Sequence, residues 1–332
     1  MADINITKNS KLIRVLADTA RGVCTDGIAM QEANDIGKAL AEDFSPQNRH
    51  MLANAISFTL TDLQQKSLTF MEPLTDMKYV DLDDKAMFMV KNSRGIRVID
   101  MAEGATPPRS YVGQKQITVG TSTIASRPAI HIHDLRTGRV NMADLIAEMN
   151  RLFTLKKMAR IEATLHGAIQ KFSRPFYGTG VGINKTVLDE QLAYFRRLGP
   201  VTIVGDFAAV SMLASLTGMA MNSTITQHSN DQINELNGTG FIGMYNGCKV
   251  LCMENAYEGD STTPLLRPDW LYIIPAGLTP DSKNLKIVTE GDVYTFEAQD
   301  INDLTFEMRS EQKFGVAFVT AHNPNLGAYF IN

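Results

Sequence analysis

The sequence predicts an α+β fold from three observations. Residues 141–172 repeat apolar side chains at steps of three and four, which is the pattern of one long amphipathic helix. Residues 85–134 alternate apolar and polar side chains between turn residues, which indicates antiparallel strands. The chain closes with further strand-like segments over residues 285–332. Because strands come before and after the helix, the helix is expected to be a central element on which the rest is arranged.

The predicted central helix is unusually long. Asn141 is expected to cap its N-terminus, with Asp144 facing the free amides of the first turn. Pro175 and Gly178 mark the point by which the pattern must have ended. At about 1.5 Å per residue the helix would be a rod of roughly 45 Å, whereas the usual globular helix has about 11–12 residues. The apolar positions that define it are Met142, Leu145, Ile146, Met149, Leu152, Phe153, Met158, Ile161, Leu165 and Ile169.

Composition narrows the class of protein. The chain has 332 residues, enough for about two domains at roughly 150 residues each. Its net charge of −4 gives no reason to expect sequence-specific binding of nucleic acid. No apolar run reaches the ~18 residues of a membrane span, and the N-terminus lacks the apolar segment of a signal peptide. Three cysteines without a scaffold spacing (Cys24, Cys248 and Cys252) favour reduced thiols in a cytosolic setting over disulfides or a metal site.

Charge is distributed unevenly along the chain. From Lys85 to Arg139 there are nine basic and three acidic residues, whereas from Ser173 to the end there are ten basic and seventeen acidic residues. One interpretation is that these are two solvated faces of a monomer. The other is that the basic segment of one copy lies on the acidic part of a second copy. Surfaces of complementary charge fix how two copies align and raise the rate at which they associate.

The N-terminal part is expected to be helical. Ser45 would cap a helix whose first position is Pro46, as helices allow. Each helix is amphipathic but short, so each needs a surface on which to dock. The three predicted helical segments cover residues 11–23, 27–44 and 45–66.

The alternating segment over residues 85–134 is expected to form a long β-ribbon. Its strand-like pieces are AMFMVK, GIRVIDM, KQITVGTSTIA and AIHIHDL, separated by turn residues. Few of its residues are left to build a core, and an isolated two-stranded ribbon is marginal in water. The ribbon is therefore expected to rest on another surface, for which a neighbouring subunit is a natural candidate.

The C-terminal half predicts a compact α/β region followed by antiparallel strands. VTIVGD is a short apolar strand, and Asp206 is placed to cap the helix that follows it. Asn246-Gly247 predicts a tight hairpin turn between two strands. LYIIPAG and LKIVTEG are further strands, and VYTFEAQD, LTFEMRSEQKFGVAFVT and LGAYFI close the chain.

No motif in the chain predicts catalysis. His131 and His133 would point to one side of a strand and could grip one ion, but no third ligand motif accompanies them. Residues 238–243, GTGFIG, match a dinucleotide fingerprint in letters, yet no strand precedes them and no helix follows. GTGVG at residues 178–182 lacks that setting too, and neither GxxxxGK[ST] nor GxSxG occurs. Exposed or interface histidines and turn glycines are the favoured interpretation; an oxidoreductase remains the alternative.

The order of the predicted elements resembles the major capsid proteins of tailed bacteriophages, whose fold is named after Hong Kong 97 phage. The resemblance covers nearly the whole chain. It includes three segments that look like axial-domain and closing-strand segments of such proteins: GTGFIGMYNGCKVLCMEN, LYIIPAG and MRSEQKFGVAFVTAHNP. It implies an N-terminal arm, an extended β-hairpin called the E-loop, a spine helix in a peripheral domain, and an α/β axial domain. By position the arm would be 1–66, the start of the peripheral domain 67–140 with the E-loop at 85–134, the spine and its connection 141–185, the axial domain 186–293, and the closing strands 294–332.

The resemblance also implies a function. The chain would assemble as hexamers and pentamers into an icosahedral head shell around double-stranded DNA, with encapsulin-type compartment shells as the alternative. It would be no enzyme and would carry no cofactor or metal. Expected partners are other copies, with scaffolding, portal and decoration proteins as further candidates, and DNA would be touched without base readout. Assembly would take place in the host bacterial cytoplasm, without a membrane, and the product would be the virion.

The E-loop would supply the contacts between copies. Some members of the family join their subunits by an isopeptide bond from an E-loop lysine, for which Lys91 or Lys115 is available by position; non-covalent cohesion is the favoured expectation. The candidate contact residues in this segment are Lys91, Arg94, Arg97, Arg109, Lys115 and Arg127.

Overall fold

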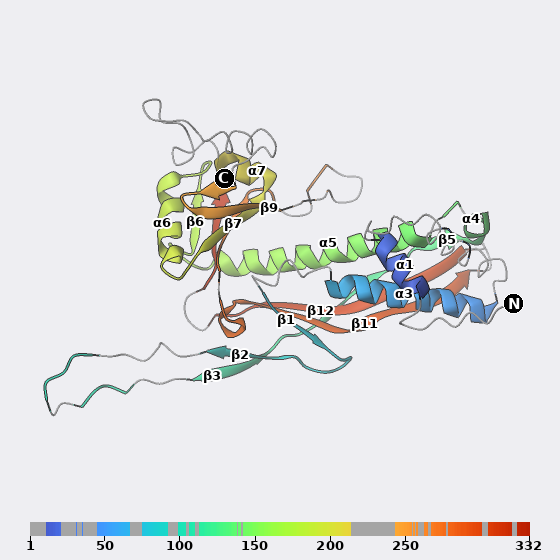
Figure 1. Cartoon of the computed structure of the whole chain (residues 1–332), viewed down its shortest axis with the longest axis horizontal. Coiled ribbons are helices and arrows are strands. Elements are labelled where there is room, and N and C mark those ends of the chain that lie inside the picture. The colour runs from blue at the N-terminus through green and yellow to red at the C-terminus, as the bar shows by residue number, and fades with distance from the viewer. Residues whose placement is uncertain are drawn as a thin grey trace.

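The computed structural model describes residues 11–20, 31, 35, 45–66, 75–91, 99–103, 106–109, 113–137, 139–140, 142–213, 243–253, 255, 257, 262–264, 267–276, 278–300, 305–320 and 324–332. It is elongated, with a compact lobe at one end and a long helix, α5, that runs out of the lobe along a sheet (Figure 1). The helices are α1 (Lys11–Ala20), α3 (Pro46–Lys66), α4 (Ile132–Thr137), α5 (Met142–Ile169), α6 (Lys185–Arg196), α7 (Phe207–Leu213) and the 3-10 helix η2 (Pro280–Ser282). The strands are β1 (Thr75–Val80), β2 (Met87–Lys91), β3 (Gln114–Thr118), β4 (Ser122–Ser126), β5 (Ala129–His131), β6 (Tyr177–Gly180), β7 (Val201–Asp206), β8 (Met244–Tyr245), β9 (Cys248–Met253), β10 (Trp270–Pro275), β11 (Leu285–Asp300), β12 (Thr305–Phe318) and β13 (Gly327–Ile331).

The long helix α5 lies within the range predicted for it. It spans Met142–Ile169, and the predicted N-cap Asn141 lies outside the described residues. Its buried face follows most of the predicted apolar stripe, but Leu145 and Met158 are only half-buried and Leu152 is 44% exposed. Ala143 and Lys157 occupy buried positions that the stripe left out. Most of the helix's stabilisation therefore comes from packing this face, which matches the general behaviour of helices in water.

The sheet beside α5 is built mainly from β11 and β12. Its strand order is β1-β11-β12-β4, with β5 also paired to β12; β1 is parallel to β11 and the other pairs are antiparallel. Helices α3 and α5 pack on one face of this sheet, and α1 packs on both helices. The largest core lies between these layers and includes Leu16, Leu52, Ile56, Leu60, Ile146, Phe153, Ile287, Phe306, Met308 and Phe314.

The N-terminal helices dock on their own chain. Ser45 Oγ accepts the backbone N–H of Asn48 at 3.4 Å, so the predicted cap of α3 is confirmed. Thr61 Oγ1 accepts the N–H of Val293 at 3.0 Å, and Ser57 Oγ donates to the carbonyl of the same residue, which joins α3 to β11. The described helices of residues 1–66 thus find the surface they need within the subunit. The predicted helix over 27–44 lies almost entirely outside the described residues.

The lobe is a mixed sheet with helices on both faces. Its order is β6-β13-β10-β7-β9-β8, with α6 and α7 packed on one face and the end of α5 on the other. Leu271 and Tyr272, neighbours on β10, show this division, since the first joins the α6–α7 core and the second the α5 core. The predicted turn is confirmed, because Asn246 and Gly247 join β8 to β9 with φ of 46° and 74°.

The strands divide between the two parts differently from the expected boundaries. The last strand, β13, was expected to return to the peripheral domain, but it lies between β6 and β10 in the lobe. Its sequence GAYFI is buried at four of its five positions, which suits a central strand. Conversely, the first half of β11, expected in the axial domain, pairs with β1 and β12 beside α5.

The predicted ribbon over residues 85–134 is shorter in the structure. Strands β2 and β3 form a separate two-stranded sheet, whereas β4 and β5 pair with β12. The expected single strand KQITVGTSTIA therefore breaks after Thr118, and the chain resumes a strand at Ser122 in another sheet. An alternating pattern identifies strands but carries no information about their partners, which explains this error. Among the described residues, no helix is both long and apolar enough to cross a membrane.

Candidate functional site

One part of the molecule that projects from its own core is the hairpin, defined here as β2, β3 and the described residues between them, 99–103, 106–109 and 113. The two strands are antiparallel, and the ladder runs from Met87 opposite Thr118 to Lys91 opposite Gln114. Phe88 and Val90 point to the buried side, whereas Met87 and Met89 are 52% and 42% exposed on the other. The hairpin lies below the long sheet and points beyond the lobe (Figure 1). It thus presents an apolar strand face to its surroundings.

The base of the hairpin packs on the sheet face opposite to α3 and α5. Phe88 and Val119 bury their side chains with Val288 of β11 in a small apolar cluster. Because Ile287 belongs to the main core, its neighbour Val288 must face the other way. The fully buried Phe88 ring has Lys286 Nζ at 5.6 Å from its centroid. This small contact area is the principal apolar attachment of the described hairpin to its own chain.

Lys286 is an example of a buried cation that is fully paired. Its side chain is 0% exposed, and Nζ lies 2.8 Å from both Asp76 Oδ2 and the carbonyl oxygen of Pro280. Lys78 adds a second cation near Phe88, at 4.9 Å from the ring centroid, and donates a short hydrogen bond to the carbonyl oxygen of Met87. Such partners offset the free-energy cost of burying a charge. These contacts attach the first residues of β2 to β1 and η2.

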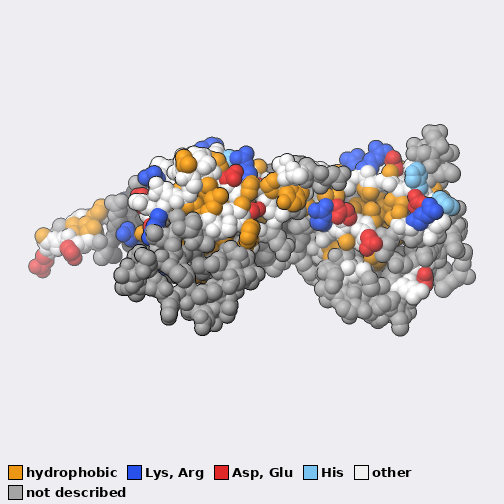
Figure 2. All heavy atoms as spheres, turned by 90° about the horizontal axis from the view of Figure 1, so that it is seen from above, with side chains coloured by type: hydrophobic (Ala, Val, Ile, Leu, Met, Phe, Trp, Pro, Cys, Tyr) orange, Lys and Arg blue, Asp and Glu red, His pale blue; other side chains and the backbone are white. Residues whose placement is uncertain are grey.

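The described outer part of the hairpin carries mixed chemistry. Ile99 and Met101 are 46% and 39% exposed, and Asp100 and Glu103 between and beside them are exposed as well. The tip at the far left of Figure 2 shows this combination of apolar and acidic side chains. The predicted basic surplus of the segment is therefore not spread uniformly over the part of it that the structure describes.

The six predicted contact residues separate into three groups. Lys115 on β3 and Arg109 are exposed on the hairpin. Arg94 and Arg97 lie outside the described residues, as does the side chain of Lys91, whose backbone ends β2. Arg127 is not on the hairpin: it lies between β4 and β5 and forms an ion pair with Glu307 of β12. Its placement in the hairpin was wrong because the predicted ribbon was too long.

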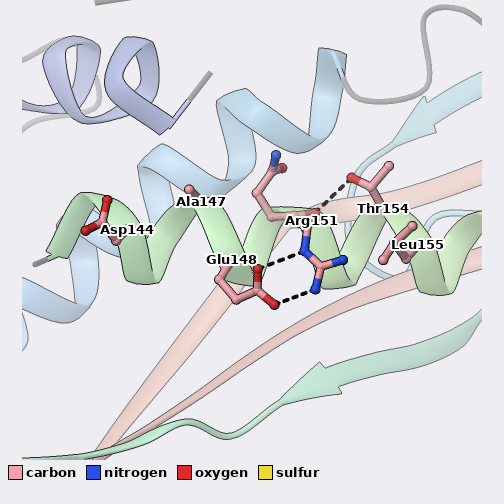
Figure 3. A pocket seen from close by; sticks show the side chains of 7 residues that line it. Asp144, Ala147, Glu148, Arg151, Thr154 and Leu155 are labelled. Atoms are coloured by element: carbon pink, nitrogen blue, oxygen red, sulfur yellow. Dashed lines mark hydrogen bonds and ion pairs between the residues drawn. The ribbon is translucent and has the colours of Figure 1, made fainter. Parts of the chain in front are cut away.

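A second surface feature is a hollow on the exposed side of α5, with a volume of about 580 Å³. Figure 3 shows its lining, which comes from successive turns of the helix. Arg151 Nε and Nη2 donate to the two oxygens of Glu148 at 2.8 and 2.7 Å. The hydrogen bond from Arg151 lowers the pKa of Glu148, so both groups remain charged and neutralise each other. Because the pairing favours the charged form of both groups, neither is poised to exchange a proton, and the hollow has the character of a helix surface. The lining residues are Asp144, Ala147, Glu148, Asn150, Arg151, Thr154 and Leu155.

The buried side of α5 contains an unusual cation. Lys157 is 0% exposed, and its Nζ has no hydrogen-bond partner in the described part of the chain. Lys157 Nζ lies 5.4 Å from the centroid of the Phe314 ring on β12, which is a favourable cation–π contact. Burial lowers the pKa of Lys157 to about 7, because the charged form loses its hydration. The sequence missed this feature, although its signal is a lysine four residues from both Phe153 and Ile161 on the apolar stripe.

The end of α5 is joined to the lobe by polar contacts. Arg267 Nη1 donates to His166 Nε2 at 2.9 Å, and the backbone N–H of Arg267 donates to Glu162 Oε1 at 2.8 Å. The His166 ring lies on Trp270, with centroids 4.4 Å apart. Burial, and then the positive charge of Arg267, lower the pKa of His166, which suits a neutral ring that accepts a hydrogen bond. Burial raises the pKa of Glu162, and Arg267 opposes that rise.

The candidate metal pair does not form. His131 ends β5, whereas His133 lies in α4, so the two side chains do not share one face of a strand as expected. No cluster of three or more His, Cys, Asp or Glu side chains suited to a metal occurs among the described residues. Cys248 and Cys252 are not joined in a disulfide. Of GTGFIG, only Gly243 lies within the described residues, and a short strand follows it.

Comparison with known proteins agrees with this picture. A family model described as "SPbeta prophage-derived putative capsid protein YonB" matches residues 8–328. A search of curated protein sequences found no match. The fold is similar to the capsid of a native GTA particle, with 11% identity over 79% of this chain and 89% of that chain and a TM-score of 0.52.

Two phage structures give the same result. A structure from Microbacterium phage Oxtober96 is 13% identical over 77% of this chain and 90% of that chain, with a TM-score of 0.51. One from Gordonia phage Cozz is 12% identical over 80% and 86% of the two chains, with a TM-score of 0.51. Likeness at such low identity shows the fold, and it confirms the α+β capsid fold expected from the order of elements. The match over residues 8–328 shows that the chain belongs to the family of the SPbeta prophage-derived capsid protein YonB.

Proposed function

We propose that this capsid protein is the major shell protein of a tailed-phage head and assembles as hexamers and pentamers of an icosahedral shell. Family membership and fold support a shell protein. The single observation that carries the assembly proposal is the hairpin, whose described outer residues are exposed and whose apolar attachment to its own chain is confined to its base. Exposed apolar surface of this kind marks an interaction site.

The hairpin corresponds to the E-loop of this proposal and would lie on a neighbouring copy. Met87 and Met89 offer apolar area, while Lys115 and Arg109 offer positive charge to a neighbour whose C-terminal half carries an acidic surplus. Apolar contact would supply affinity, and charge would fix the register. Several weak contacts of each copy with its neighbours then add up through multivalency. Cohesion between the copies is proposed to be non-covalent.

The N-terminal helices are assigned a different role. Because α1 and α3 pack into the main core of their own subunit, the described parts of residues 1–66 stabilise the subunit and are not the principal link between copies. Contact with scaffolding, portal or decoration proteins, and non-specific contact with packaged DNA, would involve surfaces of the assembled shell. Assembly would take place in the bacterial cytoplasm.

The test is assembly of the purified chain with and without the outer hairpin. Replacing residues 92–113 by a two-residue Asn-Gly turn keeps the ladder from Met87 to Lys91 and removes its extension. We expect a folded subunit with an unchanged unfolding midpoint and a loss of at least tenfold in shells counted in negative-stain images. Normal shell yield from this variant would contradict the role of the hairpin.

The kind of shell is tested separately. Wild-type chain that stays monomeric at high concentration would contradict the shell itself. In particles isolated from the producing host, nuclease-protected double-stranded DNA is expected. A protein cargo in its place would identify a compartment shell of the encapsulin type.

A further inference from the structure

The hairpin leaves the body of the protein through two roots. The first is the turn of residues 81–84 between β1 and β2, and the second is the segment of residues 119–121 between β3 and β4. Both roots pass over the β11–β12 ladder, and both are hydrogen-bonded there to one side chain, Glu290 of β11. This convergence is not part of the apolar contact at the hairpin base, since its groups are polar and charged.

Both carboxylate oxygens of Glu290 accept hydrogen bonds. Oε1 accepts the backbone N–H of Asp83 in the first root at 2.8 Å, and Oε2 accepts Thr121 Oγ1 in the second root at 2.5 Å. Lys313 Nζ of β12 donates to Glu290 Oε1 and to Asp83 Oδ1, both at 2.8 Å. The Glu290 residue is only 5% exposed. One buried side chain therefore links both roots to each other and to the two central strands of the sheet.

The backbone around Glu290 is shaped to make these contacts. Asp83 has φ of 65°, a left-handed conformation that turns its N–H toward the sheet, and Gly291 has φ of 71°. The pairing of β11 with β12 shifts register between Glu290 and Tyr294, as in a β-bulge. Bulges re-aim side chains and end regular pairing, and they are features of design rather than defects. Here the bulge lies at the point where the hairpin roots cross the strand.

The second root also lies directly on β12. A Cβ placed on Gly315 would be 2.5 Å from the carbonyl oxygen of Gly120, so only glycine allows this approach. The hydrogen bonds from Lys313 and then from Thr121 lower the pKa of Glu290 to about 2. Glu290 is consequently charged at any pH at which the protein would assemble, and the contact is permanent rather than titrating.

We propose that Glu290 is a positioning residue that sets the direction in which the hairpin leaves the subunit. The apolar contact of Phe88 and Val119 holds the base in place but is not directional, whereas hydrogen bonds are. A strand rises about 3.3 Å per residue, so the twelve steps from residue 87 to residue 99 span at most roughly 40 Å. A rotation of about 10° at the root then moves the far end by roughly 7 Å. Contacts with a neighbour demand finer placement than that, so assembly depends on the root.

The experiment measures hairpin direction in the unassembled subunit by electron–electron distance spectroscopy. Spin labels are carried by noncanonical residues at Gln116 of β3 and Ala163 of α5, both exposed, so the native thiols are left alone. In Glu290→Ala we expect the width of the distance distribution to increase at least twofold. Glu290→Gln, which keeps an oxygen for Thr121, is expected to give a smaller increase. Glu311→Gln, the same change on β12 in a pair with Arg309, is the matched control and is expected to change nothing.

The outcomes separate this proposal from the proposed function on which it rests. Because Glu290→Ala could fail to fold, Thr121→Val provides a milder variant that removes one hydrogen bond at the second root. Unchanged distances in folded Glu290→Gln and Thr121→Val subunits would overturn the positioning role, whatever the shells look like. Broader distance distributions in these variants establish the positioning role of Glu290. If shells of normal yield and uniform diameter then form from Glu290→Gln, positioning stands and the assembly role of the hairpin fails.

Discussion

From the sequence, the N-terminal helices and the hairpin both need a surface to pack on, but in the structure they pack against their own subunit to different extents. The faces of α1 and α3 enter the main core, and α3 is hydrogen-bonded to the β11 bulge through Thr61 and Ser57. The described part of the hairpin joins the body through its base and roots. A short amphipathic helix buries its single apolar stripe once it docks in a complementary groove. A two-stranded ribbon has two faces, and docking on the sheet buries one of them and leaves the other exposed. The difference shows which segment is completed within the subunit.

The same comparison assigns stability and assembly to different residues. Substitutions in α1 or α3 are expected to act on the folding of the subunit, because their side chains are part of its core. Substitutions on the outer face of the hairpin are expected to act on contacts between copies. Each of the following predictions tests whether stability and assembly do depend on different residues.

The largest expected effect is on the α3 side of the comparison. Leu60 is 0% exposed in the main core, and Leu60→Ala is expected to lower the free energy of unfolding by about 2–5 kcal/mol. Leu152→Ala is the matched control, because Leu152 is 44% exposed on α5 and the same change there should stay within about 0.5 kcal/mol. Denaturant unfolding of both variants measures the difference. Equal effects would mean that α3 is not part of a self-sufficient core.

A smaller effect is expected at the weak point of that core, Lys157. Lys157→Met replaces a buried amine, which has no hydrogen-bond partner among the described residues, by an apolar chain of similar length. It should raise the free energy of unfolding by about 1–3 kcal/mol at neutral pH. The folded pKa of Lys157, about 7, lies below the ordinary lysine pKa of 10.5, so between these pH values the unfolded chain binds the additional proton. Wild-type stability should therefore rise with pH across that window, by up to about 1.4 kcal/mol per unit.

The Lys157→Met variant removes this titrating group and provides the control. Its advantage over wild type should be fully present below pH 7 and should shrink as the pH rises from about 7 towards 10.5. Denaturant melts at a series of pH values, compared as differences between the two proteins, cancel the titration of other groups. A difference that does not vary with pH would show that Lys157 is not buried in the way described.

Much of the architecture could be predicted from local patterns. Periodicity located α5 within three residues at each end, and cap and turn chemistry located the start of α3 at Ser45 and the turn at Asn246-Gly247. The helix α6 was missed, although Asn184 caps it by accepting the N–H groups of Thr186 and Val187. These features depend on residues close together in the chain, where a single sequence is informative.

Strand partners and polar contacts could not be predicted in the same way. The pattern of β13 is compatible with either sheet, and its burial between β6 and β10 depends on segments that are distant in the sequence. In the sequence, Glu290 likewise cannot be distinguished from any other charged residue in a strand. Its contacts with Asp83 and Thr121 span 207 and 169 residues, so the convergence at the hairpin roots is visible only in three dimensions. Two of the six proposed contact residues, Arg109 and Lys115, are described on the hairpin with their side chains.

The smallest effect on stability, with the largest contrast in assembly, is expected at Lys115. Lys115→Glu reverses an exposed charge on β3 and should leave the free energy of unfolding within about 0.5 kcal/mol of wild type. If the basic hairpin lies on acidic surface of a neighbour, the same change should slow assembly and do so most at low salt, where charges are least screened. Lys156→Glu, an equal reversal on the exposed side of α5, is the matched control. Light scattering of both variants at several salt concentrations measures the rates. If the two variants assembled alike at every salt concentration, charge on the hairpin would have no part in assembly, and its contribution would be limited to the apolar face of Met87 and Met89.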